Sequence, residues 1–175
     1  SLSLNRWKSL LYIAEELFEM RINGQKNEFD LYVPNSVNTD EMHNKFKKFG
    51  ASLKNYVPSC ELQKIYNESD VLVFTESFDD NVVNFIKYSL STKIPEYMAT
   101  GRLLLAYLPK QLFSYKYISE KNVGLIASDR DELLKAIDTI LNKKKDCFIL
   151  QSNALNEVIA THSKSVVLSR LYLAV

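Results

Sequence analysis

The sequence predicts an α/β fold with a doubly wound parallel sheet and helices on both faces. Three short runs, VLVFT at 71–75, RLLLAYL at 102–108 and VGLIA at 123–127, have the continuous apolar character of strands buried on both faces. Helical segments alternate with strands, and this alternation indicates βαβ units with right-handed crossovers. The 175 residues, 46% of them hydrophobic, suffice for one domain with a sizeable core. We therefore expect residues 1–175 to form a single domain with a parallel sheet of about five strands.

The first fifty residues supply two helices and one strand of this pattern. Apolar residues recur at helical spacing in 5–22, with Arg, Lys and Glu between them. The stripe consists of Trp7, Leu10, Leu11, Ala14, Leu17, Phe18 and Ile22. EFDLYVP at 28–34 predicts a short strand that ends at its proline. The segment 39–50 predicts a helix, because Thr39 can cap it, acidic residues fill its first turn and Gly50 follows it.

The middle of the chain continues the alternation. ASLKNYV at 51–57 predicts a strand, and Pro58 and Ser59 begin a helix that continues to about Asp70. After the strand at 71–75, the segment NVVNFIKYSL is expected to be an unusually long connection. It leads to STKIPEYMATGR, which predicts a helix of about two turns, too short to be stable by its own propensity.

This short helix has clear boundary signals and an unexpected charge. Ser91 and Thr92 can cap it, Pro95 falls in its first turn, and Gly101 closes its far end. Lys93 nevertheless lies at its positive end, where the macrodipole favours an anion. A lysine in this place is explained if a phosphate-bearing ligand binds beside it.

The chain ends in two helical segments. Residues 129–141 carry an apolar stripe at helical spacing, and we expect this helix and the one at 5–22 to pack on the sheet. Residues 146–175 form a less regular pattern and predict a helical carboxy-terminal tail.

Charge and composition limit the partners. With 22 Lys and Arg against 21 Asp and Glu, the chain is not expected to bind nucleic acid through a basic surface. No apolar run is long enough for a transmembrane helix, so direct membrane insertion is not expected either. Cys60 and Cys147 are far apart in sequence and predict reduced thiols, in keeping with a cytoplasmic protein. His43 and His162 are isolated, and no metal site is expected.

The carboxyl ends of the strands are where a doubly wound sheet binds its ligands. Glu76 follows the strand at 71–75, so Glu76 and the short helix with Lys93 are expected to face one crevice. A helix N-terminus and a lysine suit a phosphate, and Glu96 could accept hydrogen bonds from a ribose diol. On pattern alone, Lys93 and Glu96 could equally be a solvated pair at i, i+3. No GxGxxG or Walker A motif is present, and four glycines exclude a glycine-rich phosphate loop.

Two segments in the middle of the chain carry a resemblance to a known family. ELQKIYNESDVLVFTESF, followed by KIPEYMATGRLLLAY, resembles the carboxy-terminal, donor-binding domain of GT-B-fold glycosyltransferases of the family 4, or group 1, type. SLSLNRWKSLLYIAEEL is similar to the first loop and helix of that domain. The similarity covers roughly residues 3–141. It implies one half of a GT-B fold, Rossmann-like, that binds a nucleotide-sugar donor.

The resemblance also implies roles for individual residues. Arg6 and Lys93 match basic residues that bind the donor diphosphate, and Glu96 matches the acid that holds the ribose. Glu76 matches the first acid of the motif, which addresses the donor sugar. Arg6, Lys93 and Glu76 are thus the candidate catalytic residues.

Further binding groups are implied around the nucleotide. Backbone groups at Val57 and Pro58 match the loop that meets the base, and Ser91 and Thr92 begin the phosphate-facing helix. One departure affects Glu76. The two acids of the motif usually stand eight positions apart, whereas an insertion separates Glu76 from Glu96 by twenty.

Retaining transfer of a hexosyl group to a glycan or lipid-linked acceptor, as in polysaccharide biosynthesis, is the activity that the resemblance implies. No cofactor or metal is expected, because cationic side chains would stabilise the diphosphate leaving group and the nucleotide-sugar, for example a UDP-sugar, is itself the substrate. The acceptor-binding amino-terminal domain is expected to be absent, so the fragment alone should transfer nothing. In the whole protein, the cytoplasm or the inner face of the membrane is the expected location.

Two other functions remain open on sequence grounds. One is a sugar-nucleotide epimerase-like or hydrolase half-domain of the same fold. The other is a non-catalytic, receiver-like α/β signalling module, for which Asp79 or Asp80 would accept a phosphoryl group.

Overall fold

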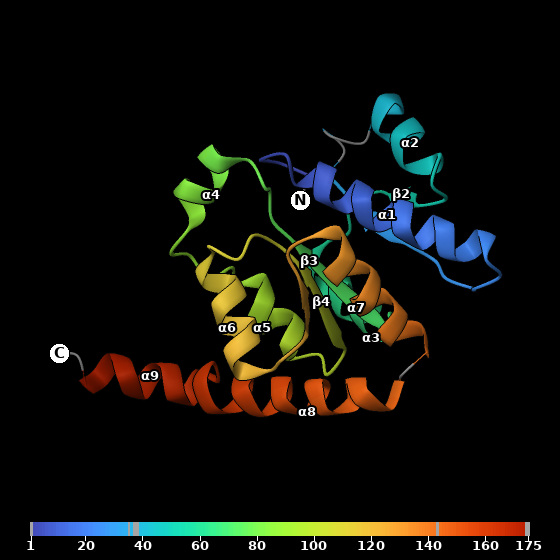
Figure 1. The fold of residues 1–175 in the computed structure, drawn as a ribbon. Coiled ribbons are helices and arrows are strands. Elements are labelled where there is room, and N and C mark those ends of the chain that lie inside the picture. The colour runs from blue at the N-terminus through green and yellow to red at the C-terminus, as the bar shows by residue number, and fades with distance from the viewer. Residues whose placement is uncertain (1, 35, 37–38, 143, 174–175) are drawn as a thin grey trace.

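The computed structural model describes residues 2–34, 36, 39–142 and 144–173. Helices and strands alternate along the chain as far as α7, except that the two helices α4 and α5 follow one another between β3 and β4 (Figure 1). The elements are α1 (Arg6–Ile22), β1 (Asp30–Tyr32), α2 (Asp40–Lys47), β2 (Ser52–Lys54), α3 (Ser59–Glu68), β3 (Val71–Thr75), α4 (Asp80–Ile86), α5 (Lys93–Met98), β4 (Leu103–Tyr107), α6 (Phe113–Lys121), β5 (Leu125–Ala127), α7 (Arg130–Asn142), α8 (Lys144–Thr161) and α9 (Lys164–Leu173).

The five predicted strands are all present and all their pairings are parallel, but they do not form one sheet. β3, β4 and β5 form a three-stranded sheet in that order, with Val73 opposite Leu105 and Leu105 opposite Leu125. β1 and β2 form a separate pair, with Leu31 opposite Leu53. The expectation of one continuous sheet is therefore wrong. Apolar runs predict that strands are buried, but they do not specify which strands become neighbours.

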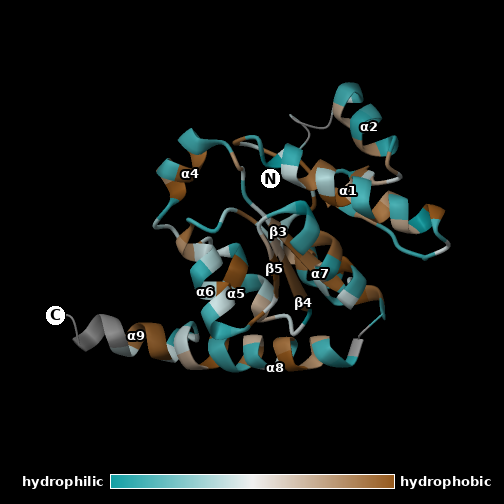
Figure 2. Cartoon of the chain, in the orientation of Figure 1, coloured by the Kyte–Doolittle hydropathy of each residue, from teal (hydrophilic) through white to brown (hydrophobic). Residues whose placement is uncertain are grey.

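Two helical layers cover the three-stranded sheet. On one face, α1 contacts β3 and α7 contacts β5, as predicted for these two helices. On the other face, α5 and α8 contact β4, and α6 contacts β5 (Figure 1). Figure 2 shows the apolar strands between these layers and polar positions on the outer sides of the helices. The domain thus has the doubly wound α/β architecture that the sequence predicts.

Two short helices were not predicted. α4 occupies the segment expected to be a plain connection, and α6 follows β4. Only Ser114 and Ile118 of α6 are buried, so its sequence lacks the apolar stripe by which a helix is recognised. α4 buries only Val83 and has the same weakness. The predicted tail consists of two helices, α8 and α9, and residues 174–175 lie outside the described residues.

α1 buries a slightly different face from the predicted stripe. Ile13 is fully buried, whereas Ile22 is 63% exposed at the end of the helix. Glu16 is also buried, and Arg130 at the start of α7 donates to its Oε1 from Nε at 2.9 Å and from Nη2 at 2.5 Å. Burial of this carboxylate is tolerated because the guanidinium pairs with it.

Gly124, just before β5, is expected to tolerate no side chain. A Cβ at this position would lie 2.7 Å from the backbone oxygen of Leu104, which cannot move without disturbing β4. We expect Gly124→Ala to lower the free energy of unfolding by about 1–3 kcal/mol in a urea titration. Gly24→Ala is the control, because a Cβ there meets nothing within 4 Å and only the positive φ of 89° opposes it. A smaller loss for Gly124→Ala than for Gly24→Ala would contradict this account of the packing.

Candidate functional site

The candidate site lies at the carboxyl end of β3. Here the chain leaves the sheet through Glu76 and Ser77, both of which are buried. The backbone N–H of Glu76 still donates to the carbonyl of Tyr107 at 3.3 Å, which extends the ladder between β3 and β4. The Glu76 side chain is therefore held at a fixed place on the sheet edge, 5% exposed as a residue.

Arg6, at the start of α1, makes a two-point contact with Glu76. Its Nε donates to Glu76 Oε2 at 2.5 Å and its Nη2 donates to Oε1 at 3.1 Å. A planar guanidinium on a carboxylate in this fork arrangement is both strong and orientationally specific. The pair brings together two residues that the sequence analysis had assigned to the site from positions seventy residues apart.

Further contacts fix the beginning of α1 against the loop after β3. Ser9 donates through Oγ to the carbonyl of Glu76 at 2.7 Å, and this bond is buried. Asn5 donates through Nδ2 to Asp79 at 2.5 Å, and Lys8 lies 3.7 Å from the same carboxylate. The functional placement of Ser9 was not predicted, because a lone serine on a helix has no sequence signal.

α5 is held in place by its apolar side. Ile94 and Met98 are fully buried between the sheet and α8, which fixes the other side of this short helix toward the site. Thr92 occupies the predicted N-cap position but makes no side-chain capping bond, because its backbone is itself helical. Ser91 caps the helix weakly instead, because its Oγ accepts a long hydrogen bond of 3.4 Å from the N–H of Lys93.

Lys93 differs from Arg6 in its surroundings. Its Nζ lies 5.7 Å from the centroid of the Tyr97 ring, and within the described ranges no ion pair involves it. The side chain is partly exposed and borders the same cavity as Arg6, Glu76 and Ser91. Lys93 therefore has the position and the unused charge of a residue that could meet an anion.

Glu96, one turn later, contacts a residue that the sequence analysis did not single out. Tyr66 of α3 donates through its hydroxyl to Glu96 Oε1 at 2.9 Å. Two causes raise the pKa of the Tyr66 phenol well above its usual value. Burial is the larger cause, and the hydrogen bond to Glu96 is the second. Burial and the nearby Glu96 charge raise the pKa of Tyr97 to about 12.

These tyrosines predict loss of stability in alkali. A phenol whose pKa is higher in the folded state contributes stability that is complete below about pH 10 and is lost as the pH rises through about 12. We expect the free energy of unfolding to fall between about pH 10 and about pH 12 and to fall less steeply in Tyr97→Phe. Urea titrations across this range provide the measurement. Equal slopes for the two proteins would contradict the assignment to Tyr97.

A polar pocket of about 170 Å³ lies beside the Arg6–Glu76 pair. It is lined by Arg6, Glu76, Ile86, Ser89, Ser91, Leu112 and Ser114. The structure therefore brings Arg6, Glu76 and Ser91 together, with Lys93 on an adjoining surface. Ser89 and Ser114 were missed, the latter because α6 itself was not predicted.

Four other predicted residues lie apart from this pocket. Thr92, Glu96, Val57 and Pro58 are not among its described lining residues, nor among those of the larger cavity beside it. Pro58 is the N-cap of α3 and is exposed. Their binding roles stay predictions.

Other side chains with possible chemistry lie elsewhere. In the part of the chain that the structure describes, no group of three His, Cys, Asp or Glu residues could hold a metal ion. Nε2 of His162 lies 2.9 Å from the hydroxyl of Tyr117. Cys60 is exposed and Cys147 is buried, and both are free thiols.

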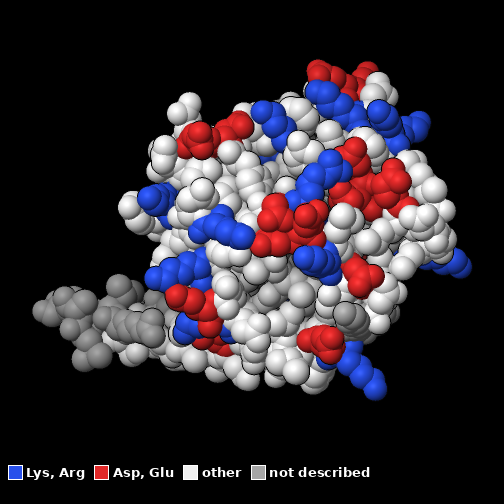
Figure 3. Space-filling view, in the orientation of Figure 1, with Lys and Arg blue, Asp and Glu red and all other residues white. Residues whose placement is uncertain are grey.

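Two further observations concern the charge of the surface and the hydropathy of the helices. Basic and acidic side chains lie interspersed on the face shown in Figure 3, in keeping with the near balance of charge in the sequence. Among the described helices, none combines the length and apolar character needed to cross a bilayer.

Comparison with known proteins finds similarity in structure only. No family model matches the chain, and no curated protein matches it in sequence. A solved structure of trehalose-6-phosphate synthase, OtsA, matches with a TM-score of 0.64 at 15% identity, covering 91% of this chain and 38% of that one. A second, described as trehalose-6-phosphate from E. coli bound with UDP-2-fluoro glucose, matches with a TM-score of 0.60 at 16% identity, covering 89% and 37%.

A third match, WaaG, a glycosyltransferase involved in lipopolysaccharide biosynthesis, has a TM-score of 0.49 at 11% identity and covers 82% of this chain and 46% of that one. The chain spans less than two fifths of the length of the first two structures. The chain has the Rossmann-like α/β fold of the part of these GT-B glycosyltransferases on which it superimposes.

Proposed function

We propose that this chain is the donor-binding half of a glycosyltransferase, which holds a nucleotide-diphosphate sugar at the carboxyl end of β3. The observation that carries the proposal is the Arg6 guanidinium, fixed by Glu76 at the edge of a polar pocket and bordered by Lys93. The fold supports it, since a neighbour of the same architecture is bound with UDP-2-fluoro glucose. We further propose that the transferred sugar is a hexose and that the reaction proceeds with retention.

Arg6 has hydrogen-bond donors left for a diphosphate. A guanidinium carries five N–H groups, and two of those on Arg6 are directed at Glu76. Within the described ranges, Nη1 makes one long hydrogen bond of 3.5 Å, to Ser3 Oγ. The remaining donors and the Lys93 ammonium could share the phosphate oxygens, where negative charge grows as the bond to the sugar breaks. Fixed cations at that point stabilise the leaving group without a metal.

Glu96 would hold the ribose. Tyr66 donates to one of its oxygens, Oε1, and Oε2 could then accept from a sugar hydroxyl. Because Glu96 is exposed, a ligand can reach this carboxylate from solvent. Val57, Pro58, Ser91 and Thr92 would supply the backbone and hydroxyl contacts to the base and phosphates that the sequence resemblance implies.

The role of Glu76 in the proposed reaction changes. The sequence resemblance implies a carboxylate that addresses the donor sugar, but both oxygens of Glu76 accept from Arg6 in this structure. A carboxylate in this position serves best as the group that orients Arg6. Contact between Glu76 and the sugar would require Arg6 to turn away when the donor binds.

The acceptor-binding half would be supplied by another part of the whole protein. Phe85 and Tyr88, 82% and 85% exposed, stand on α4 and just after it, next to the pocket residues Ile86 and Ser89. Apolar rings at the rim of a binding site are suited to contact with a second domain. The chain alone is then expected to bind donor and to transfer no sugar.

Calorimetric titration of the chain with UDP, GDP and ADP, and with the matching nucleosides, tests the proposal. One diphosphate is expected to bind at least tenfold more tightly than its nucleoside, because two cations contact only the phosphates. Equal affinity for diphosphate and nucleoside would contradict the proposed site. Incubation with acetyl phosphate is the control for the signalling alternative, which requires phosphorylation of Asp79 or Asp80.

A further inference from the structure

Tyr66, in the last turn of α3, holds one oxygen of a glutamate on another helix. The tyrosine is 7% exposed, and its hydroxyl donates to Glu96 Oε1 on α5 at 2.9 Å. Glu96 itself is exposed. A buried tyrosine hydroxyl needs a hydrogen-bond partner, but a backbone carbonyl would satisfy it equally well. This hydroxyl instead restrains a carboxylate that a ligand can reach from solvent.

An unrestrained glutamate would be a poor binding group. Its side chain has several rotatable bonds and, when exposed, populates several rotamers, so a ligand must order it on binding. In this structure Oε1 of Glu96 is already held by Tyr66. Within the described ranges no hydrogen bond engages Oε2, which can therefore accept from the hydroxyls of a ligand. The contact thus orders the carboxylate and leaves one oxygen available.

The tyrosine in this contact remains the donor. Burial, and then the hydrogen bond to Glu96, raises the pKa of the Tyr66 phenol well above its usual value. The phenol therefore keeps its proton at neutral pH, and the carboxylate is the acceptor.

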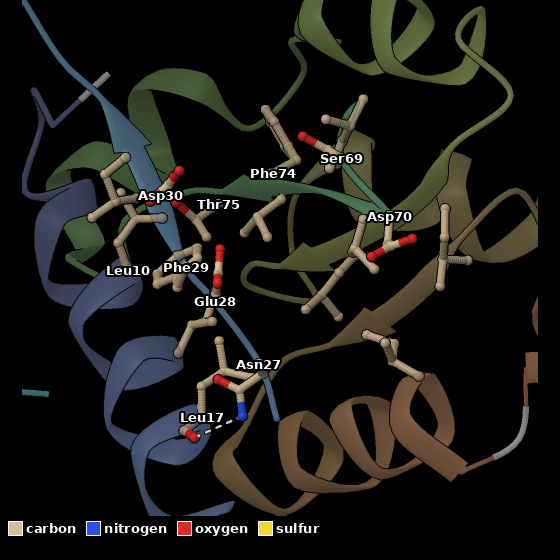
Figure 4. Close-up of a pocket in the computed structure, with 18 of the residues that line it drawn as sticks. Leu10, Leu17, Asn27, Glu28, Phe29, Asp30, Ser69, Asp70, Phe74 and Thr75 are labelled. Atoms are coloured by element: carbon tan, nitrogen blue, oxygen red, sulfur yellow. Dashed lines mark hydrogen bonds between the residues drawn. The ribbon is translucent and has the colours of Figure 1, made fainter. Parts of the chain in front are cut away.

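The end of α3 is fixed by both central strands. Just after this helix, the N–H of Ser69 donates to the carbonyl of Tyr66 at 3.3 Å. Ser69 and Asp70 lead directly into β3, and Figure 4 shows both where this strand begins. The guanidinium of Arg102, just before β4, donates to the carbonyl of Asn67. The backbone that carries Tyr66 is therefore tied to the chain that enters each of the two strands.

The ring of Tyr66 packs on the helix that carries Glu96. Tyr97, the next residue of that helix, lies edge-to-face against Tyr66, with ring centroids 5.4 Å apart and ring planes at 75°. On the same helix, Ile94 and Met98 are fully buried. Both partners of the hydrogen bond therefore stand on packed elements. Under this condition a supporting residue can hold a binding group in one geometry.

We propose that Tyr66 is a positioning residue of the donor site, which orients Glu96 Oε2 toward the hydroxyls of a ribose. The inference rests on the proposed function, in which Glu96 holds that sugar. It adds that the ribose contact depends on a side chain that lies behind Glu96. It also makes the site selective for ribonucleotides, because a nucleotide without ribose hydroxyls gains nothing from an ordered Glu96.

The test removes the Tyr66 hydroxyl and, separately, the ribose hydroxyls. UDP, GDP and ADP are each compared with their 2′,3′-dideoxy forms by calorimetric titration of the unaltered chain and of Tyr66→Phe. For the diphosphate that the chain prefers, Tyr66→Phe is expected to weaken binding by about three- to tenfold, because Glu96 must then be ordered on binding. Affinity for the dideoxy form is expected to stay unchanged. Equal losses for the two forms, or no loss for either, would overturn the proposal.

Tyr117→Phe is the matched control. Tyr117, on α6, also donates its hydroxyl to a glutamate on another helix, Glu157 of α8, at 3.3 Å. The variant shows whether the removal of a phenol–glutamate contact lowers affinity through stability alone. We expect both affinities to remain as in the unaltered chain. A loss for the ribose form as large as that in Tyr66→Phe would contradict a specific role for Tyr66.

A measurement without nucleotide separates this inference from the proposed function. Three-bond NMR couplings show whether the Glu96 side chain keeps one rotamer. We expect a single rotamer in the unaltered chain and in Tyr117→Phe, and averaging in Tyr66→Phe. Unchanged couplings in Tyr66→Phe would overturn the positioning role even if nucleotide binds. If the couplings change but the unaltered chain binds ribose and dideoxy forms equally, the ribose assignment of the proposed function is wrong, and this inference falls with it.

Discussion

Arg6→Ala is expected to lower the free energy of unfolding by about 3 kcal/mol in a urea titration at neutral pH. The substitution leaves the Glu76 carboxylate, which is almost fully buried, without the two guanidinium donors at 2.5 and 3.1 Å. A buried carboxylate without its partner loses far more than the modest net value of the pair, because its desolvation is no longer compensated.

Lys8→Ala is the matched control for this prediction. Lys8 is a cation on the same helix that faces Asp79 at 3.7 Å, with both side chains about half exposed. We expect the loss for this exposed pair to stay below about 1 kcal/mol. In addition, Arg6→Ala combined with Glu76→Gln should recover part of the stability lost in Arg6→Ala, since the orphaned charge is removed. Equal small losses for Arg6→Ala and Lys8→Ala, with no recovery in the double variant, would show that the pair does not organise this edge.

Lys93→Ala is expected to weaken binding of the nucleoside diphosphate by about ten- to a hundredfold. The loss corresponds to one charge-assisted hydrogen bond, worth roughly 1.5–3 kcal/mol. Affinity for the bare nucleoside should hardly change, because only the diphosphate offers oxygens to the ammonium. Folding stability should stay the same or rise slightly, since the cation stands at the positive end of α5. Calorimetric titration of both ligands and a urea titration provide these values.

Two further variants serve as controls for Lys93→Ala. Lys135→Ala removes the same charge from an exposed position on α7 and should leave the affinity unchanged. Glu96→Gln should weaken nucleoside and diphosphate alike, because it acts through the ribose. If Lys93→Ala destabilises the fold and leaves diphosphate affinity intact, the lysine has a structural role and the phosphate assignment is wrong.

Much of the fold could be predicted from the sequence, because strands buried on both faces have an unmistakable pattern. VLVFT and the core of RLLLAYL became β3 and β4 as expected. The separation of β1 from β3 could not be predicted, since an apolar run looks the same whether its neighbour is present or not. The helices α4 and α6 were missed for a related reason. Each buries only one or two side chains, so its sequence shows no apolar stripe at helical spacing.

Individual residues of the site could be predicted from the sequence, but the contacts between them could not. Glu76 follows a buried strand and Lys93 begins a short helix, and both features are visible in the sequence. The pairing of Glu76 with Arg6 depends on α1 folding back to the carboxyl end of β3, which no local pattern encodes. Tyr66 was missed as the partner of Glu96 because the two residues lie on different helices, thirty positions apart.

A structure of the chain with UDP bound tests the central claim most directly. The account predicts the diphosphate at the carboxyl end of β3, with phosphate oxygens within hydrogen-bond distance of the Arg6 guanidinium and of Lys93 Nζ, and with the ribose hydroxyls at Glu96. UDP bound away from these three side chains, or bound with its phosphates directed into solvent, would contradict it.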